Sequence, residues 1–531
     1  MKQINKIEQL FAKGKITRRD FLARLSALGI TASLSPALFG TTAQAATPKK
    51  GGRLRLGMAG GATTDTLDPA LISDSVAHNI SFQARNCLVE IDASGNAIPE
   101  LAENWESTPD ATKWIFNLRK DVEFHNGKTM TSEDVKFSIN HHRSEESKSA
   151  AKALAKQIEE IKIDGKNTVI FTLKGGSADF PYLLSDYHFQ IVPNGTAGKE
   201  WDKGIGTGGY ILEKHEPGVR AFSRKNPNYW KEGRAHFDEV ETIIINDAPA
   251  RTTALKTDAI DVMNRCDVKT VHLLKKVKGL QIINVTGPKF YDMPMLVDVP
   301  PYDNNDVRLA LKYAIDREQL INIVLGGYGS VGNDHPIGPS YRFHASEAEI
   351  PQRMYDPDKA RFHLKKAGMD GHTFNIHAAD AAFLGGVDTV VLFREQAAKA
   401  GIKVKIVREP NDGYWSNVWM NKSWCVGYWA GRGTADWMFS VGYAAEAAWN
   451  YTRWKHERFN KLLVEARAEL DESKRREMYV EMQRICSDEG GTIIPVFADI
   501  LLSANTRLKY NKVGALYDMD NQRNTECWWF A

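Results

Sequence analysis

Residues 114–128 read WIFNLRKDVEFHNGK and open with the strand pattern that decides the fold class. Trp114, Phe116 and Leu118 stand at every second position, which is the spacing of side chains on one face of a β-strand. The same alternation recurs at residues 54–56, 169–173 and 402–406. The sequence therefore predicts several short strands that each bury one face.

Helical periodicity appears between these strands. Apolar side chains recur at helical spacing in residues 303–325, where a second helix is predicted to begin at Asp316, with Gln319 completing a capping box. Two more apolar stripes, at residues 459–470 and 478–486, predict a pair of packed helices ahead of an apolar strand around residues 493–497. The fold class predicted by this alternation is α/β.

The charge balance excludes several classes of partner. The 531-residue chain has a formal net charge of +3, and its first 45 residues hold seven Lys and Arg against two acids, so the remainder is close to neutral. We therefore expect no binding of nucleic acid or anionic lipid. The five cysteines form no C-x-x-C pair or Cys/His cluster, so no metal or cofactor is expected. One disulfide and buried free thiols both fit their spacing.

The first 45 residues read as a twin-arginine export signal. A basic start is followed by Thr17-Arg18-Arg19-Asp20-Phe21-Leu22, a moderately apolar run and Ala43-Gln44-Ala45, so we expect cleavage before Ala46. The alternative is an amphipathic N-terminal helix that happens to carry paired arginines. No cysteine stands near the cleavage site and no later apolar run could span a bilayer, which predicts a soluble periplasmic protein.

Several motifs resemble one known family in that family's own order. They are GGRLR at 51–55, TLDP at 66–69, IPELAENW at 98–105, VEFHNGK at 122–128, TSEDV at 131–135, GTGGY at 206–210, NPNYW at 226–230 and VRLALKYAIDR at 307–317. Together with WIFNLR at residues 114–119, they make the chain similar to the peptide, nickel and opine solute-binding proteins of ABC importers. The resemblance covers essentially the whole chain after the leader.

This resemblance implies a two-lobed periplasmic-binding-protein fold with an extra domain inserted in the N-terminal lobe. Two crossing segments near residues 290 and 497 would form the hinge, and the lobes would close on a ligand that contacts both. The implied partners are inner-membrane permease subunits with their ATPases, and the implied state is a monomer. The expected boundaries are 46–80, 205–290 and 498–531 for lobe I, 81–204 for the inserted domain and 291–497 for lobe II.

Residues 411–454 contain seven of the thirteen tryptophans. Each of these side chains alone could be a core residue, but a dense aromatic segment with interspersed polar residues is typical of a pocket wall. In the dipeptide-binding relatives a Trp-x-Gly-Asp segment binds the peptide's amino terminus, whereas this chain has Trp429-Ala430-Gly431-Arg432. The strand that carries a carboxylate-binding Arg in those relatives matches residues 374–383 here, where Asp380 is the only charge. Simple dipeptides are therefore poor candidates.

The resulting hypothesis is that Arg432 binds a carboxylate or other anion bidentately. The cationic or apolar part of the ligand would be surrounded by other members of the candidate set, which comprises Asp380, Asp436, Trp415, Trp419 and Trp429. In the alternative, Arg432 pairs with Asp436 and touches no ligand. From lobe I, the resemblance adds Asp68 and the loop 206–209 to the pocket lining.

Competing functions are an enzyme, a metal carrier and a sensor. No G-x-S-x-G or H-E-x-x-H motif is present, so no catalytic residues are predicted. Uptake of nickel or another metal chelate, of an opine or of a sugar remains open within the family, although the 411–454 segment offers no histidine cluster. A chemosensory binding protein that docks on a receptor is the third alternative.

Overall fold

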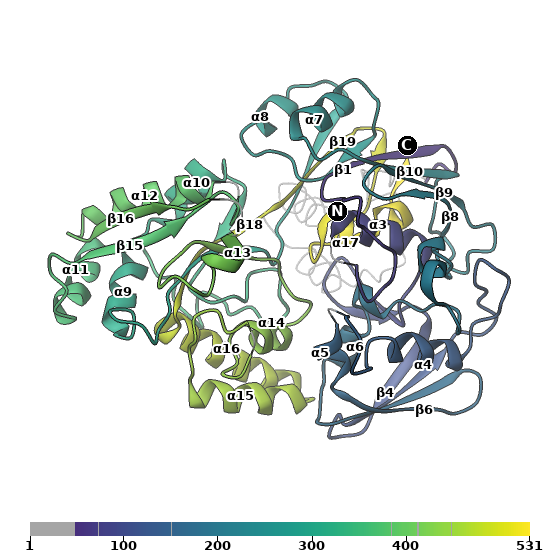
Figure 1. Ribbon diagram of the computed structural model, residues 1–531, viewed down its shortest axis with the longest axis horizontal. Coiled ribbons are helices and arrows are strands. Elements are labelled where there is room, and N and C mark those ends of the chain that lie inside the picture. Colours follow the sequence, from purple (N-terminus) through teal and green to yellow (C-terminus); the bar gives the residue numbers. More distant parts are fainter. Residues whose placement is uncertain (1–47, 73, 150, 384, 411–413, 448) are drawn as a thin grey trace, which may run out of the picture. The chain divides into compact units, whose positions relative to one another are not determined.

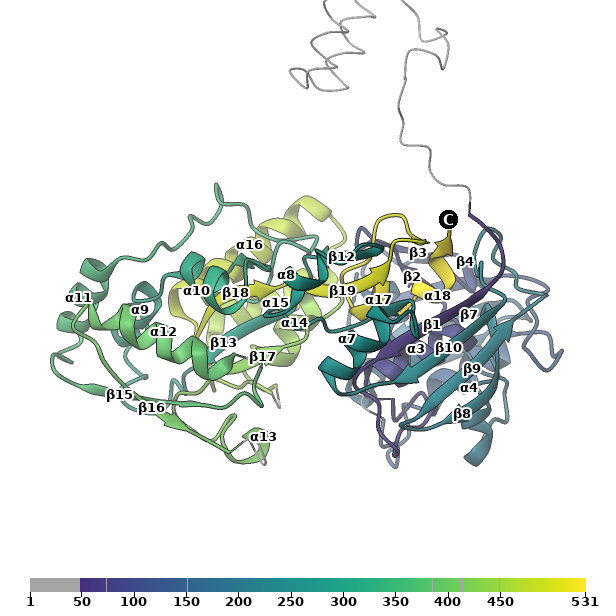
Figure 2. The ribbon, with the colours of Figure 1, turned by 90° about the horizontal axis from the view of Figure 1, so that it is seen from above.

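The computed structural model (Figures 1 and 2) describes residues 48–72, 74–149, 151–383, 385–410, 414–447 and 449–531. The predicted leader and its cleavage site lie outside these ranges. Residues Lys49–Phe530 form one unit. Within the described ranges, no helix has the combined length and apolar character needed to cross a bilayer.

The largest sheet gathers strands from both ends of the described chain. In spatial order they are β12 (Leu280–Val285), β19 (Ile500–Asn505), β11 (Val262–Met263), β1 (Arg53–Met58), β10 (Glu239–Ile244), β9 (Arg220–Lys225) and β8 (Tyr210–Glu216). Strand β1 runs parallel to β10 and β11, and the other pairings are antiparallel. Helices α3 (Ser75–Ala84), α7 (Ala248–Lys256) and α8 (Val271–Leu274) pack against this sheet.

A second, antiparallel sheet contains the strand predicted from residues 114–118. Its order is β4 (Ala102–Ser107), β5 (Lys113–Leu118), β7 (Thr168–Leu173) and β6 (Ile158–Ile163), and α4 (Ser132–Asn140) covers one face. Trp114, Phe116 and Leu118 are all buried, which confirms the period-two prediction. Four short elements flank this sheet, namely β2 (Val89–Ile91), β3 (Ala97–Pro99), α5 (Lys152–Ala155) and α6 (Phe180–Leu183).

The third sheet has the order β14 (Gly329–Val331), β18 (Thr492–Ala498), β13 (Phe290–Pro294) and β17 (Gly427–Trp429), and β15 (Thr373–Ala378) pairs in parallel with β16 (Lys403–Arg408) nearby. The predicted helices are present, and Asp316 caps α10 by accepting from the Gln319 backbone N–H at 2.9 Å. The predicted capping box is incomplete, because the Asp316 N–H donates to the Gln396 side chain at 2.9 Å instead of to Gln319. The helices of this region are α9 (Asn305–Tyr313), α10 (Arg317–Val324), α11 (Pro357–Lys366), α12 (Gly386–Ala398), α13 (Tyr414–Asn417), α14 (Ala435–Gly442), α15 (Glu457–Ala468) and α16 (Glu472–Glu489).

The chain passes between the first and third sheets twice. It leaves β12 and enters β13 through residues 286–289, and it leaves β18 and enters β19 through Asp499. The two passages lie side by side, since the Ala498 N–H donates to the Lys289 carbonyl at 2.9 Å. After β19 the chain forms β20 (Leu508–Lys509), α17 (Asp518–Asn521), α18 (Asn524–Cys527) and β21 (Trp529–Phe530). All five cysteines are free thiols, which decides between the two alternatives left by their spacing.

The loop 206–209 belongs to a buried junction. A Cβ on Gly208 would lie 2.4 Å from the Ala84 carbonyl carbon, so only glycine permits this approach to the end of α3. The Thr207 hydroxyl donates to Asn86 at 3.0 Å, and its carbonyl accepts from the Trp230 indole at 3.2 Å. Close packing of backbone segments explains the glycines of this loop, and that the loop lines the ligand pocket stays a prediction.

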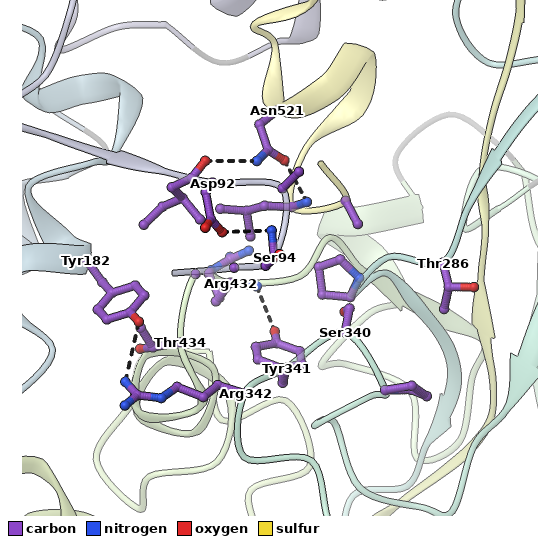
Figure 3. A pocket seen from close by; sticks show the side chains of 18 of the residues that line it. Asp92, Ser94, Tyr182, Thr286, Ser340, Tyr341, Arg342, Arg432, Thr434 and Asn521 are labelled. Atoms are coloured by element: carbon purple, nitrogen blue, oxygen red, sulfur yellow. Dashed lines mark hydrogen bonds between the residues drawn. The ribbon is translucent and has the colours of Figure 1, made fainter. Parts of the chain in front are cut away.

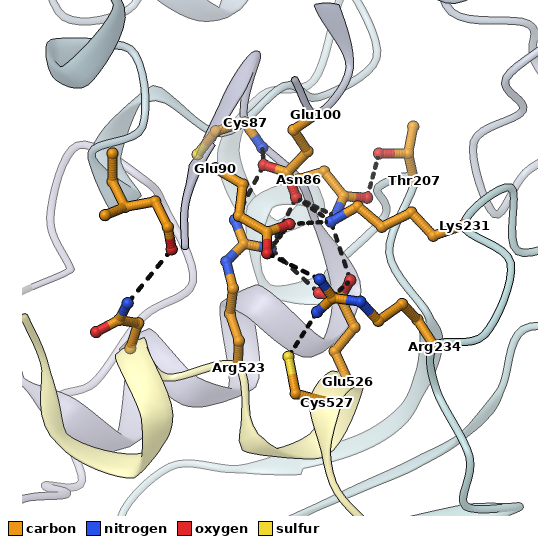
Figure 4. A network of polar contacts seen from close by, with 12 residues as sticks. Asn86, Cys87, Glu90, Glu100, Thr207, Lys231, Arg234, Arg523, Glu526 and Cys527 are labelled. Carbon is orange, nitrogen blue, oxygen red and sulfur yellow. Dashed lines mark hydrogen bonds and ion pairs between the residues drawn. The ribbon is translucent and has the colours of Figure 1, made fainter. Parts of the chain in front are cut away.

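A buried ionic network lies beside this junction (Figure 4). The Lys231 ammonium contacts the carboxylates of Glu90, Glu100 and Glu526 at 2.6, 2.7 and 2.9 Å. The Arg523 guanidinium donates to both oxygens of Glu100, at 2.7 and 2.9 Å. Three parts of the chain far apart in sequence are thereby joined, including the C-terminal segment.

The network predicts a specific loss of stability in acid. Burial raises the pKa of Glu90, but the positive charges of Lys231, Arg523 and Arg234 outweigh it and hold this pKa well below its usual range. A lowered folded-state pKa contributes stability that is present above the unfolded value of about 4.3 and is lost as the pH falls below it. We expect Glu90→Gln to lower the free energy of unfolding by about 3–5 kcal/mol at pH 7 and to flatten its decline below about pH 4.3.

Urea denaturation followed by circular dichroism at several pH values measures both effects. The matched control is Glu239→Gln, which removes an exposed partner of Arg53 at 2.6 Å and should cost less than about 1 kcal/mol. Equal losses in the two variants would contradict a stabilising role for the buried network.

Candidate ligand-binding site

A pocket of about 270 Å³ is lined by loops from distant parts of the chain (Figure 3). Its lining includes residues from the stretches 91–95, 339–343, 432–435 and 512–521. Residues 285–288, at the first crossing segment, also contribute. Because its walls come from the surroundings of the first and third sheets, the pocket depends on how the whole unit folds.

Arg432 lines this pocket. Its backbone N–H donates to the Tyr341 hydroxyl at 2.9 Å, and its guanidinium donates to the carbonyls of Ala430 and Gly431 at 2.8 and 3.2 Å. The guanidinium carbon also lies 5.4 Å from the centre of the Trp429 ring. In the described part of the chain this guanidinium has no carboxylate partner, so the ion pair with Asp436 that we considered as an alternative is absent.

Asp436 forms an ion pair with Arg467. It is only 8% exposed, and its carboxylate accepts from Nε of Arg467 at 3.1 Å and 3.3 Å. Burial raises the pKa of Asp436 to about 6 despite the neighbouring Arg467. Asp436 does not line the pocket, and its contacts are those of a residue that anchors α14 to α15.

The structure brings the three candidate tryptophans together. The ring centres of Trp415 and Trp419 lie 5.9 Å apart, and those of Trp419 and Trp429 lie 6.2 Å apart. Exposure changes along this row from 40% at Trp415 to 5% at Trp429. The buried indole N–H groups of Trp419 and Trp429 have no acceptor within the described residues. The row thus connects the core to solvent and ends at Arg432, but none of the three tryptophans is among the described residues that line the pocket.

The two other candidates lie apart from this row. Asp380 is exposed after β15 and accepts a long hydrogen bond, at 3.4 Å, from the Val387 N–H. The Asp68 carboxylate binds the His141 ring at 2.7 Å and the Ala70 N–H at 2.9 Å. Neither residue is among those that line the pocket around Arg432.

Of the candidate residues predicted from the sequence, Arg432 alone is among the described residues that line the pocket, and three polar residues of the lining illustrate what was missed. Tyr341 and Ser340 lie in a loop after β14, and Lys512 lies between β20 and α17. None belongs to a periodic segment or a motif, so no local signal marks them. In the described ranges, no group of three or more His, Cys, Asp or Glu residues is placed to hold a metal ion.

Comparison with known proteins identifies the family. Residues 96–451 match the model of the bacterial extracellular solute-binding proteins, family 5, middle part. The dipeptide-binding protein of Escherichia coli K12 is 26% identical over 471 residues, which are 80% of this chain and 86% of that protein.

Solved structures agree on the fold. The agropinic acid complex of the periplasmic binding protein AgaA from A. tumefaciens R10 has a TM-score of 0.73 at 23% identity and covers 90% of this chain and 99% of its own. A putative peptide-binding protein, AppA, from Clostridium difficile reaches a TM-score of 0.79 at 21% identity, covering 90% and 100%. The predicted two-lobed α/β fold is confirmed, and the chain belongs to the bacterial extracellular solute-binding proteins of family 5.

Proposed function

We propose that this protein is the periplasmic substrate-binding component of an ABC importer and captures a small organic solute in the pocket that contains Arg432. The observation that carries the proposal is the pocket itself, because loops from both sides of the crossing segments converge on it. A solute there contacts groups attached to two different sheets. Such a solute favours the closed arrangement of the lobes, since it makes its full contacts only there.

The lobe boundaries and the hinge belong to this proposal. The passages at residues 286–289 and at Asp499 join the two sheets, so rotation about them is the simplest motion that opens and closes the pocket. Lobe I then comprises residues 46–80, 205–290 and 498–531, with 81–204 as the inserted domain and 291–497 as lobe II. The remaining partners are the permease subunits and their ATPases, and the working state is a monomer.

The ligand is peptide-like or derived from an amino acid, and can be zwitterionic. The matched family supports a transport role rather than catalysis, because it is a family of solute-binding proteins. Nickel, opine or sugar binding and a chemosensory role stay as alternatives. Among the candidate residues that the structure describes, Arg432 lines the pocket, whereas Asp68, Asp380, Asp436, Trp415, Trp419 and Trp429 lie outside its lining. The three tryptophans stay in the proposed site through their row of ring contacts, which reaches Arg432 at Trp429.

Ligand binding should stabilise the protein and compact it. A solute at one hundred times its Kd adds about 2.7 kcal/mol to the free energy of unfolding, which raises Tm in a thermal-shift screen of peptides, opines, amino-acid derivatives, sugars and nickel chelates. Small-angle X-ray scattering with the best solute should show a smaller radius of gyration. Turnover of the solute, with no stable complex, would instead revive the enzyme alternative.

Export should depend on the arginine pair. We expect the double variant Arg18→Lys/Arg19→Lys to stay in the cytoplasm, because the pair marks the twin-arginine route, while Lys13→Arg is exported normally. Cell fractionation measures the distribution, and mass spectrometry of the exported protein should place its N-terminus at Ala46. A periplasmic double variant would contradict this assignment.

A further inference from the structure

Some of the charged side chains that line the pocket have an ion-pair partner, and others do not. Five charged side chains line it, namely Asp92, Asp179, Arg342, Arg432 and Lys512. Asp179 is paired with Arg475 at 2.7 Å, and Arg342 with Glu472 at 2.6 Å. These two pairs therefore contribute little net charge to a ligand.

Among the described residues of this lining, the one acid without a cationic partner already accepts from backbone donors. Asp92 accepts from the N–H groups of Ser94 and Asn96 at 2.7 and 2.9 Å, which closes the turn after β2. In contrast, Arg432 donates to carbonyls and Lys512 donates to the Ser94 hydroxyl at 3.0 Å, and neither cation has a carboxylate partner among the described residues. The lining thus keeps a surplus of positive charge.

The neutral groups around Arg432 also offer hydrogen-bond donors to a ligand. The Tyr341 oxygen already accepts from the Arg432 N–H, so its own proton is free to be donated to a ligand. Burial raises the pKa of Tyr341 to about 12, which keeps that proton in place at neutral pH. The buried Ser340 hydroxyl has no partner within the described residues. Both groups can donate to an oxyanion.

The first turn of α14 adds to this surplus. Gly433, Thr434 and Ala435 line the pocket at the N-terminus of this eight-residue helix. A helix N-terminus carries a partial positive charge and exposes N–H groups, which favour an anion beside it. The one acid of this turn, Asp436, is bound to Arg467. Because the Asp436 carboxylate is paired with Arg467, it does not neutralise the positive end of the helix beside Gly433 and Thr434.

From this donor surplus we infer that the solute is an organic anion. Its carboxylate or equivalent oxyanion lies against Arg432 and the N-terminus of α14, and Lys512 faces it from the C-terminal segment. An ammonium group at the same place meets these two cations and, among the described residues, no unpaired carboxylate without backbone partners, so the lining disfavours cationic solutes. This inference rests on the proposed solute-binding function and narrows its ligand class.

A matched set of probes tests the charge preference. Isothermal titration calorimetry is carried out with the dipeptide Ala-Phe in its free, N-acetylated, C-amidated and doubly blocked forms, and with glutarate as a small dicarboxylate. In parallel, solutes released by denaturing the natively purified protein are identified by mass spectrometry. We expect the best-binding or released solute to carry an anionic group. We also expect the N-acetylated peptide to bind more tightly than the C-amidated peptide.

Variants locate the site. Arg432→Gln should weaken binding of the best solute about 10- to 100-fold, as expected for loss of a charge-assisted hydrogen bond, and Lys512→Gln should weaken it less. Lys405→Gln removes the same charge from the exposed strand β16 and should leave Kd unchanged. Circular dichroism checks that each variant is folded.

Two results overturn the inference while the proposed function stands. One is a best-binding solute without any anionic group, and the other is a Kd that Arg432→Gln changes less than twofold. If no probe binds, no solute is released and the screen of solute classes is also negative, the proposed function itself fails.

Discussion

The buried network around Lys231 is the constraint on which the architecture depends. Its carboxylates come from residues 90–100 and from Glu526, so β2, β3 and the C-terminal segment are held at one point. An isolated carboxylate at this depth would cost several kcal/mol, and only the opposing charges make its burial tolerable. The segment that precedes Glu526, residues 512–521, lines the pocket. The pocket wall is therefore positioned by a network that does not itself contact a ligand.

The C-terminal segment also carries backbone strain. Met519, Asp520, Asn521 and Gln522 all have φ between 51° and 62°, which makes α17 a single left-handed turn. Each such non-glycine residue costs about 1–2 kcal/mol. Two side chains hold the turn: Asp520 accepts from the Gly514 N–H and the Trp528 indole, and Asn521 accepts from the Leu516 N–H. Strain of this kind persists where the surroundings over-determine the backbone.

The spacing of apolar residues and the N-cap residue Asp316 were sufficient to predict several strands and helices of the fold. The strand at 114–118 and the helix after Asp316 follow from local spacing, which depends only on neighbours in the chain. The loop 206–209 shows the limit of a resemblance: its glycines belong to a family motif, and the structure shows that they permit close packing on Ala84. A motif identifies positions under constraint, but the constraint itself is visible only in three dimensions.

A site residue could be predicted where its neighbours in the sequence mark it, but not where its role depends on partners that are distant in the sequence. Arg432 stood out because it replaces an acid in a recognisable segment. Asp436 looked equally suitable four residues later, but its partner is Arg467, 31 residues away, and that pairing removes it from the pocket. Lys512 lies in no motif, and it matters because no carboxylate of the described residues pairs with it. The charge that a pocket offers to a solute is what remains after tertiary pairing, and this remainder cannot be counted along the sequence.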